Sequence, residues 1–261
     1  MIVEDNAPRS PIAPLVEMRE VTKQFGSLTA VDRVDLDIHA GEVHAILGEN
    51  GAGKTTLMNV LTGLLKPDSG RIFLDGSEVS ISSPRKALEL GIGIVHQHFR
   101  LVENFTAAEN LHLGWNETPR LAGNKDLIDR THALAKQFNL DVEPNARIWQ
   151  LSVGEQQRVA ILRTLSRGAR ILILDEPTAV LTPTEAGRLF EMLRGLADSS
   201  NRAVIFISHK LDEVIAASDR VTVLRTGSRV NTLRTVDCNQ ELLAEMMIGR
   251  HLDAQPAPPS M

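Results

Sequence analysis

The sequence predicts an α/β fold in which helices cover a mostly parallel sheet. Two short aliphatic segments that end at turn residues, VHAILG (43–48) and RILILDEP (170–177), have the pattern of buried parallel strands. Segments 202–209 and 220–227 repeat this pattern. Helical patterns alternate with these strands, at about 53–63, 126–138, 155–166, 184–198 and 210–217. Such alternation is typical of parallel strands joined by crossover helices.

Composition supports a globular chain and excludes several classes of protein. Of 261 residues, 43% are hydrophobic and 23% charged, so the chain can bury a full core. The longest apolar run, Ala203 to Ile207, is far shorter than the ~18 residues that a membrane span needs. A single cysteine, Cys238, excludes a disulfide framework and argues against a cysteine-based zinc site. The net charge of −5 and the scarcity of aromatic residues argue against a nucleic-acid partner.

The domain organisation is read from proline content and from the strand pattern. Six of the twelve prolines lie near the two ends, which predicts a flexible tail at 1–14 and a Pro-rich tail or linker at 251–261 around a body at 15–250. The stretch from about 98 to 168 has helical patterns but no buried strand, so we expect a helical insertion there. The first residues show no secretory signal.

The segment GENGAGKTT follows a predicted buried strand and opens a predicted helix, as a phosphate-binding P-loop requires. Its glycines let backbone amides approach phosphate oxygens at a helix N-terminus. A lysine at the end of such a loop reaches the β- and γ-phosphates, and the hydroxyl that follows ligates Mg²⁺. The alternative is an ordinary glycine-rich turn. The candidate nucleotide-binding residues are Gly48, Glu49, Asn50, Gly51, Ala52, Gly53, Lys54, Thr55 and Thr56.

Two carboxylates end the strand ILILDEP. Asp175 and Glu176 are consecutive, so their side chains leave opposite faces of the pleat. We expect Asp175 to hold Mg²⁺ and Glu176 to orient the attacking water as a general base. The pair alone is also compatible with a helix cap, but the P-loop beside it favours phosphate chemistry.

A third motif, LSVGEQQRV (151–159), resembles the signature of ATP-binding-cassette (ABC) ATPases, and the motif order over 15–250 matches that family. The resemblance implies a P-loop NTPase fold with an N-terminal antiparallel β region and a helical ABC-specific subdomain. It also implies that Ser152 and the Gly154 amide bind the γ-phosphate of ATP held by an opposite cassette. Val153 and Glu155 depart from the commonest version, which has Gly and Gln there.

The resemblance assigns three further residues. Gln97 matches the Q-loop glutamine, which bridges Mg²⁺ and water, and His209 matches the switch histidine that contacts the γ-phosphate. Phe25 takes the place of the aromatic that stacks on adenine, with a plain core role as the alternative. The histidines that flank Gln97 are interpreted as ordinary residues and not as a metal pair.

One departure points to a subgroup. Where the family often has Leu-Asp after the Asp-Glu pair, this chain has Leu181-Thr182, so the aspartate that connects the two nucleotide sites is replaced. The segments EPTAVLTPTE, GIGIVHQHFRLVENFTAAENLHLG and LAEMMIGR resemble the N-terminal cassette of bacterial simple-sugar and nucleoside importers. That subgroup carries two cassettes in one chain, so this chain is expected to be the first half of a tandem or a free-standing cassette.

The resemblance implies an ATP-hydrolysing importer subunit that uses ATP and Mg²⁺, at the cytoplasmic face of the membrane. The implied partners are a second cassette, transmembrane permease subunits and, indirectly, a substrate-binding lipoprotein. The aromatics Phe99, Phe105 and Trp115 either line the groove for a permease helix or belong to the subdomain core. Two other functions stay open: a soluble ABC ATPase acting on ribosomes or DNA, and a nucleotide-binding regulator that does not hydrolyse.

Overall fold

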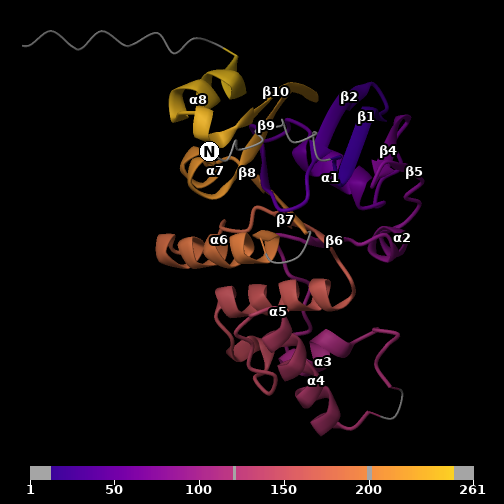
Figure 1. Ribbon diagram of the computed structural model, residues 1–261, viewed down its shortest axis with the longest axis vertical. Helices are drawn as coiled ribbons and strands as arrows, with labels where there is room; N and C mark the ends of the chain where they lie inside the picture. The colour runs from indigo at the N-terminus through magenta and orange to yellow at the C-terminus, as the bar shows by residue number, and fades with distance from the viewer. Residues whose placement is uncertain (1–12, 120–121, 199–201, 250–261) are drawn as a thin grey trace, which may run out of the picture.

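The computed structural model describes residues 13–119, 122–198 and 202–249 (Figure 1). The expected tail at 251–261, and all but the last two residues of the expected tail at 1–14, lie outside the described residues. Within the described ranges, no helix has both the length and the apolar character that crossing a bilayer requires.

The larger sheet confirms the predicted parallel core. Its strand order is β10-β9-β3-β8-β7-β6, and the five strands from β9 to β6 are parallel, whereas β10 pairs antiparallel with β9. The four segments predicted as buried strands correspond to β3, β7, β8 and β9. The bounds are β3 Val43–Leu47, β6 Ile92–Val95, β7 Ile171–Asp175, β8 Ala203–Ser208, β9 Arg220–Arg225 and β10 Ser228–Arg234.

A second, antiparallel sheet of order β2-β1-β4-β5 confirms the N-terminal β region that the resemblance implied. Strand β2 of its long hairpin packs against the helix that follows the P-loop. The hairpin therefore lies beside that loop. The bounds are β1 Val16–Phe25, β2 Leu28–Ile38, β4 Ser69–Leu74 and β5 Ser77–Val79.

The five predicted helices are present, and each begins and ends within three residues of its expected bounds. They are α1 Lys54–Leu61, α4 Asn124–Gln137, α5 Val153–Ser166, α6 Pro183–Asp198 and α7 Leu211–Ala217. Three further helices were not predicted, because two have only six residues and the third is close to the C-terminal tail. These are α2 Pro84–Glu89, α3 Ala107–His112 and α8 Gln240–Ile248, and short 3-10 turns occupy Ile148–Gln150 and Thr235–Asp237.

The core lies on both faces of the larger sheet, because alternate side chains of each strand point to opposite faces. On β8, Val204 and Phe206 pack into one cluster with α5, α6 and α7. Ile205 and Ile207 pack into the other, with α1 and the antiparallel sheet. The sheet is therefore covered on both sides, as strands that are buried on both faces require.

Strand β6 was not predicted from the sequence. Its four residues are too short for a clear pattern, and Gly93 interrupts the aliphatic run. A Cβ at Gly93 would lie 2.3 Å from Thr164 Cγ2 and 2.9 Å from Ala169 Cβ. The glycine is needed for close packing of β6 against α5, which only the tertiary structure reveals.

Between β6 and β7 the described chain forms α3, α4 and α5, at the lower end of the view in Figure 1. A fully buried side chain, Asn110 of α3, holds the loop that enters this region. Its Oδ1 accepts from the Val102 N–H at 2.7 Å, and its Nδ2 donates to the carbonyls of Val102 and Thr106, both at 3.0 Å. One side chain thus satisfies backbone groups of a loop that no strand supports.

Replacing Asn110 with alanine should lower the free energy of unfolding by about 2–4 kcal/mol, because a fully buried side chain loses three hydrogen bonds and the Val102 N–H loses its acceptor. Urea unfolding followed by circular dichroism measures this. Asn231→Ala, at an exposed position of β10, is the control and should change stability by under about 1 kcal/mol. Equal losses in the two variants would contradict the clamp role of Asn110.

Candidate nucleotide-binding site

The P-loop lies between β3 and α1, and its shape depends on glycines that neighbouring segments crowd. Gly53 has φ 98°, in the left-handed region, and a Cβ there would lie 2.4 Å from the Ala30 carbonyl oxygen of β2. A Cβ at Gly48 would lie 2.4 Å from the Leu224 carbonyl oxygen of β9. Gly51 also has a positive φ, of 83°, but faces open space. Both strain and close packing therefore select glycine in this loop.

Gly53→Ala should distort the P-loop, because it adds both a disfavoured φ and a backbone clash. We expect nucleotide affinity to fall by more than about tenfold and stability to fall by more than about 1 kcal/mol. Isothermal titration with ATP and thermal unfolding measure the two effects. Gly187→Ala is the matched control, since a Cβ at Gly187 in α6 meets nothing within 4 Å. That control should stabilise the protein, because alanine favours a helix.

Lys54 is the first residue of α1 and is only 6% exposed. Its Nζ donates to the carbonyl oxygens of Gly48 at 2.7 Å and Glu49 at 2.9 Å. Burial lowers the pKa of Lys54, and the negative charges of Glu176 and Asp175 oppose that shift. The ammonium group is thus held inside the loop and faces the acidic end of β7.

Asp175 ends β7 beside the P-loop helix. Burial and the neighbouring Glu176 raise the pKa of Asp175, whereas Lys54 and a hydrogen bond with the Thr55 side chain lower it. Thr55 is exposed, so its hydroxyl is accessible to a ligand. A carboxylate and a hydroxyl in contact match the oxygen donors that Mg²⁺ prefers, since this ion keeps waters and phosphate oxygens as its other ligands. The residues present therefore fit a magnesium ion.

Glu176 has φ 46°, in the left-handed region where a non-glycine residue is uncommon. Its Oε1 lies 3.2 Å from Nδ1 of His209, which follows the neighbouring strand β8. The side chain of Glu176 is 23% exposed and that of His209 is 47% exposed. The Glu176 carboxylate and the His209 ring therefore face each other at the ends of two neighbouring strands.

Gln97 and Phe25 enter from two other elements. Gln97 is exposed two residues after β6, which is parallel to β7, so it leaves the sheet at the same edge as Asp175. Phe25 ends β1 in the hairpin that carries Ala30 to the P-loop, and it is 47% exposed. The Lys23 ammonium lies 5.6 Å from its ring centroid. Phe25 therefore has a ring surface open to a flat ligand and is not a core residue.

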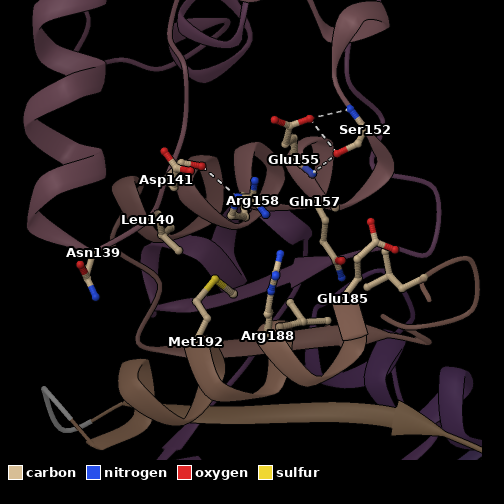
Figure 2. Close-up of a pocket in the computed structure, with 13 residues that line it drawn as sticks. Asn139, Leu140, Asp141, Ser152, Glu155, Gln157, Arg158, Glu185, Arg188 and Met192 are labelled. Atoms are coloured by element: carbon tan, nitrogen blue, oxygen red, sulfur yellow. Dashed lines mark hydrogen bonds between the residues drawn. The ribbon is translucent and has the colours of Figure 1, made fainter. Parts of the chain in front are cut away.

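The signature residues lie at the N-terminus of α5, with Ser152 as the N-cap. Ser152 and Gly154 line an open groove of about 450 Å³ between α5 and α6, and no P-loop residue is among its lining (Figure 2). Glu155 points back to Ser152 and accepts from both its N–H and its hydroxyl. The groove at the signature residues is thus separate from the P-loop of the same chain.

The family model described as "ABC transporter" matches residues 31–179, more than half of the chain. The chain belongs to the ABC transporter family. "Nucleoside import ATP-binding protein NupA" from Lactococcus lactis is 49% identical over 239 residues, which cover 90% of this chain and 47% of the relative. "Glucose import ATP-binding protein TsgD13" from Haloferax volcanii is 45% identical over 268 residues, covering 92% of this chain and 48% of the relative.

This ABC cassette also has the fold of solved family structures. The dimeric structure of a bacterial ABC transporter cassette matches with a TM-score of 0.71 and 26% identity, over 84% of this chain and 98% of that chain. The chain spans about half the length of the curated relatives it matches. The fold class expected from the sequence is therefore confirmed, and the cassette is an ATP-binding one.

In this cassette Thr182 stands where the family often has an aspartate, and it caps the start of α6 together with Glu185. The Thr182 hydroxyl donates to Glu185 Oε2 at 2.7 Å, the Thr182 N–H donates to the same oxygen at 2.9 Å, and the Glu185 N–H donates back to Thr182 Oγ1 at 3.4 Å. The sequence indicates only that Thr182 cannot supply a carboxylate. The structure adds that Glu185 brings one to the same turn of α6.

A network behind Glu176 and His209 was missed by sequence reasoning. Glu213 of α7 accepts from Thr178 Oγ1 at 2.6 Å and from Lys210 Nζ at 2.8 Å. Its carboxylate thereby joins the loop after Glu176 to the residue after His209. The Lys210 and Glu213 spacing of three residues was visible, but no local signal pairs Glu213 with Thr178, 35 positions away.

The three aromatics of the helical region have different environments. Phe99 is half-buried and packs against the core cluster of α5. Phe105 is 38% exposed, and Trp115 stacks on His112 with ring centroids 5.3 Å apart. The core role thus fits Phe99 best, whereas Phe105 offers apolar surface near the loop that carries Gln97.

Proposed function

We propose that this chain is the ATP-hydrolysing cassette of a membrane importer for nucleosides or sugars. The observation that carries the proposal is the convergence of Lys54, Asp175, Glu176 and His209 at the ends of adjacent parallel strands, beside a P-loop. This set contains the parts that phosphoryl transfer to water requires: a cation for the phosphates, metal ligands and a carboxylate for the water.

In the proposed reaction the P-loop amides and Lys54 bind the β- and γ-phosphates, and Phe25 stacks on the adenine. A magnesium ion held by Thr55, Asp175 and Gln97 would neutralise charge on these phosphates. Glu176 accepts a proton from the water that attacks the γ-phosphorus, and the bond to the ADP oxygen breaks. His209 donates a hydrogen bond to the phosphoryl group as it is transferred to water.

A complete site requires a second cassette. Ser152 and Gly154 open into a groove that excludes the P-loop of their own chain, so the γ-phosphate they bind belongs to a partner. The dimeric form of a solved family cassette supports this pairing. ATP then closes two cassettes on each other and hydrolysis releases them, which is a ligand-driven shift between two states.

We assign importer coupling to the loop after Gln97 and the helical region that follows it. Arg163 of α5 donates to the carbonyls of Phe99 at 3.1 Å and Arg100 at 3.3 Å, which attaches this loop to the signature helix. A permease helix seated there would sense closure, and the chain would then act at the cytoplasmic face of a membrane. The nucleoside and glucose importers among the relatives support a sugar or nucleoside as the solute.

Reconstitution tests the proposal. The chain is combined in lipid vesicles with permease subunits of a nucleoside or sugar importer, and uptake of labelled nucleosides and sugars is measured with and without ATP. ATP-dependent uptake of either solute class is the expected result. Sedimentation with ribosomes or DNA in place of membranes would instead favour a soluble ABC ATPase. ATP binding without phosphate release in the full assembly would favour a regulator that does not hydrolyse.

A further inference from the structure

The Ser152 hydroxyl is already engaged by a carboxylate of its own helix. Ser152 Oγ donates to Glu155 Oε2 at 2.7 Å, and the Ser152 N–H donates to the same oxygen at 2.8 Å, as Figure 2 shows. The Glu155 N–H donates back to Ser152 Oγ at 3.4 Å. A serine hydroxyl has one proton to donate. A phosphate oxygen bound at Ser152 therefore competes with Glu155 for that proton.

Glu155 is ionised at neutral pH. The hydrogen bonds from the Ser152 side chain and backbone, the largest causes, lower its pKa. The positive charge of Arg158, one turn further along α5, also lowers the pKa of Glu155. The Arg158 Nε itself donates to another group, the Asp141 carbonyl, at 2.9 Å. The carboxylate thus keeps its negative charge at the rim of the groove, beside the site where a phosphate would bind.

The charge opposes phosphate binding in two ways. A phosphate oxygen in hydrogen-bond contact with Ser152 would lie within about 6 Å of the Glu155 carboxylate, so the two negative charges repel each other. An acidic residue in the first turn also offsets the positive end of the helix dipole, which otherwise attracts the anion. Glutamine at this position would keep the oxygen that accepts from Ser152 and would remove the charge.

We propose that Glu155 acts as a brake on nucleotide-driven pairing of two cassettes: its carboxylate holds the Ser152 hydroxyl and repels the γ-phosphate that the partner cassette presents. The inference rests on the proposed paired-cassette function. The brake keeps the closed pair weak, so that cassettes reopen readily. Glu155 is in this sense a positioning residue, since it acts on the phosphate through Ser152 and through its charge.

The chain provides a matched control for the charge. In α3, Glu109 Oε2 accepts from the Thr106 N–H at 2.7 Å, and the Glu109 N–H donates to Thr106 Oγ1 at 3.1 Å. This capping box shares the two backbone hydrogen bonds of the Ser152 cap but not its bond from the hydroxyl to the carboxylate, and it lies on another helix and outside the groove lining. Glu109→Gln therefore makes the same chemical change at a cap that faces no nucleotide.

Association of the full chain is measured by sedimentation velocity with ATP and Mg²⁺, each variant carrying Glu176→Gln to block hydrolysis. Glu155→Gln should lower the dissociation constant of the pair about tenfold with ATP, and leave it unchanged with ADP, which lacks the γ-phosphate. Glu109→Gln should match the parent. Glu155→Ala, which loses the cap as well as the charge, should also tighten the pair despite a lower unfolding temperature.

Three results would overturn the inference, and they differ in meaning. If the parent pairs with ATP and Glu155→Gln pairs no more tightly, the brake is refuted while the paired-cassette function stands. If no variant pairs at any ATP concentration, the paired function fails and the brake with it. Equal tightening in ADP and ATP would likewise refute the role of γ-phosphate repulsion.

Discussion

Replacing Lys54 with alanine should abolish ATP binding at micromolar nucleotide. The Lys54 ammonium is 6% exposed and is held by two carbonyls of the loop, so it is already positioned where phosphates would lie. Charge-assisted hydrogen bonds to phosphate contribute about 1.5–3 kcal/mol each, and Lys54 can make two. We therefore expect the dissociation constant of ATP to rise by roughly 100-fold or more.

Isothermal titration with ATP and Mg²⁺ measures this loss. Lys66→Ala is the control, because Lys66 is an exposed lysine in the segment after α1, outside the P-loop. It removes the same charge from the chain but should leave affinity unchanged. Lys54→Ala should keep a cooperative unfolding transition, so that the loss is one of binding and not of folding. An unchanged dissociation constant in Lys54→Ala would refute the P-loop interpretation.

Replacing Glu176 with glutamine should lower the rate of ATP hydrolysis about 100-fold or more while ATP still binds. An amide has nearly the size of the carboxylate but cannot accept the proton of the attacking water, and general bases contribute about 10²–10⁴ in rate. The contact with His209, at 3.2 Å, can persist because an amide also hydrogen bonds. The effect should therefore fall on turnover and not on affinity.

Phosphate release under saturating ATP, measured in the presence of the permease subunits, reports this effect. Titration of the same variant with ATP should give the parental affinity or a higher one, since a negative charge near the γ-phosphate is lost. Glu89→Gln, at an exposed position of α2, serves as the control and should hydrolyse ATP at the parental rate. Equal rates for Glu176→Gln and the parent would remove Glu176 as the base.

Much of the parallel core was predictable from local patterns. The strands at 43–48 and 202–209 are aliphatic on both faces, so the sequence alone indicates burial between two helical layers. Strand β6 was not predictable, because Gly93 is selected by Thr164 and Ala169, which are distant in sequence. The antiparallel sheet was predicted only through the family resemblance.

Part of the candidate site was likewise predictable from local patterns, and part was not. The loop GENGAGKTT and the Asp175-Glu176 pair were visible, because a P-loop needs fixed spacing and a buried strand before it. The Glu213 network and the Asn110 clamp were not, because their partners lie on other elements. The sequence also shows Glu155 and Thr182 as departures from the family pattern. The hydrogen bonds of the fold show that each belongs to a helix cap: Glu155 is the carboxylate that accepts from Ser152, and Thr182 is the cap residue that donates to Glu185.

The sequence by itself determined the fold class, the order of the motifs and the types of residue that meet a nucleotide. These follow from periods of two or three to four residues and from fixed local spacings, which are properties of a short stretch of backbone. The tertiary structure alone decided that Ala30 and Leu224 select the P-loop glycines, and that the signature groove has no residue of its own P-loop in its lining. Those relations depend on side-chain rotamers and on contacts between elements distant in sequence, and no local pattern encodes them.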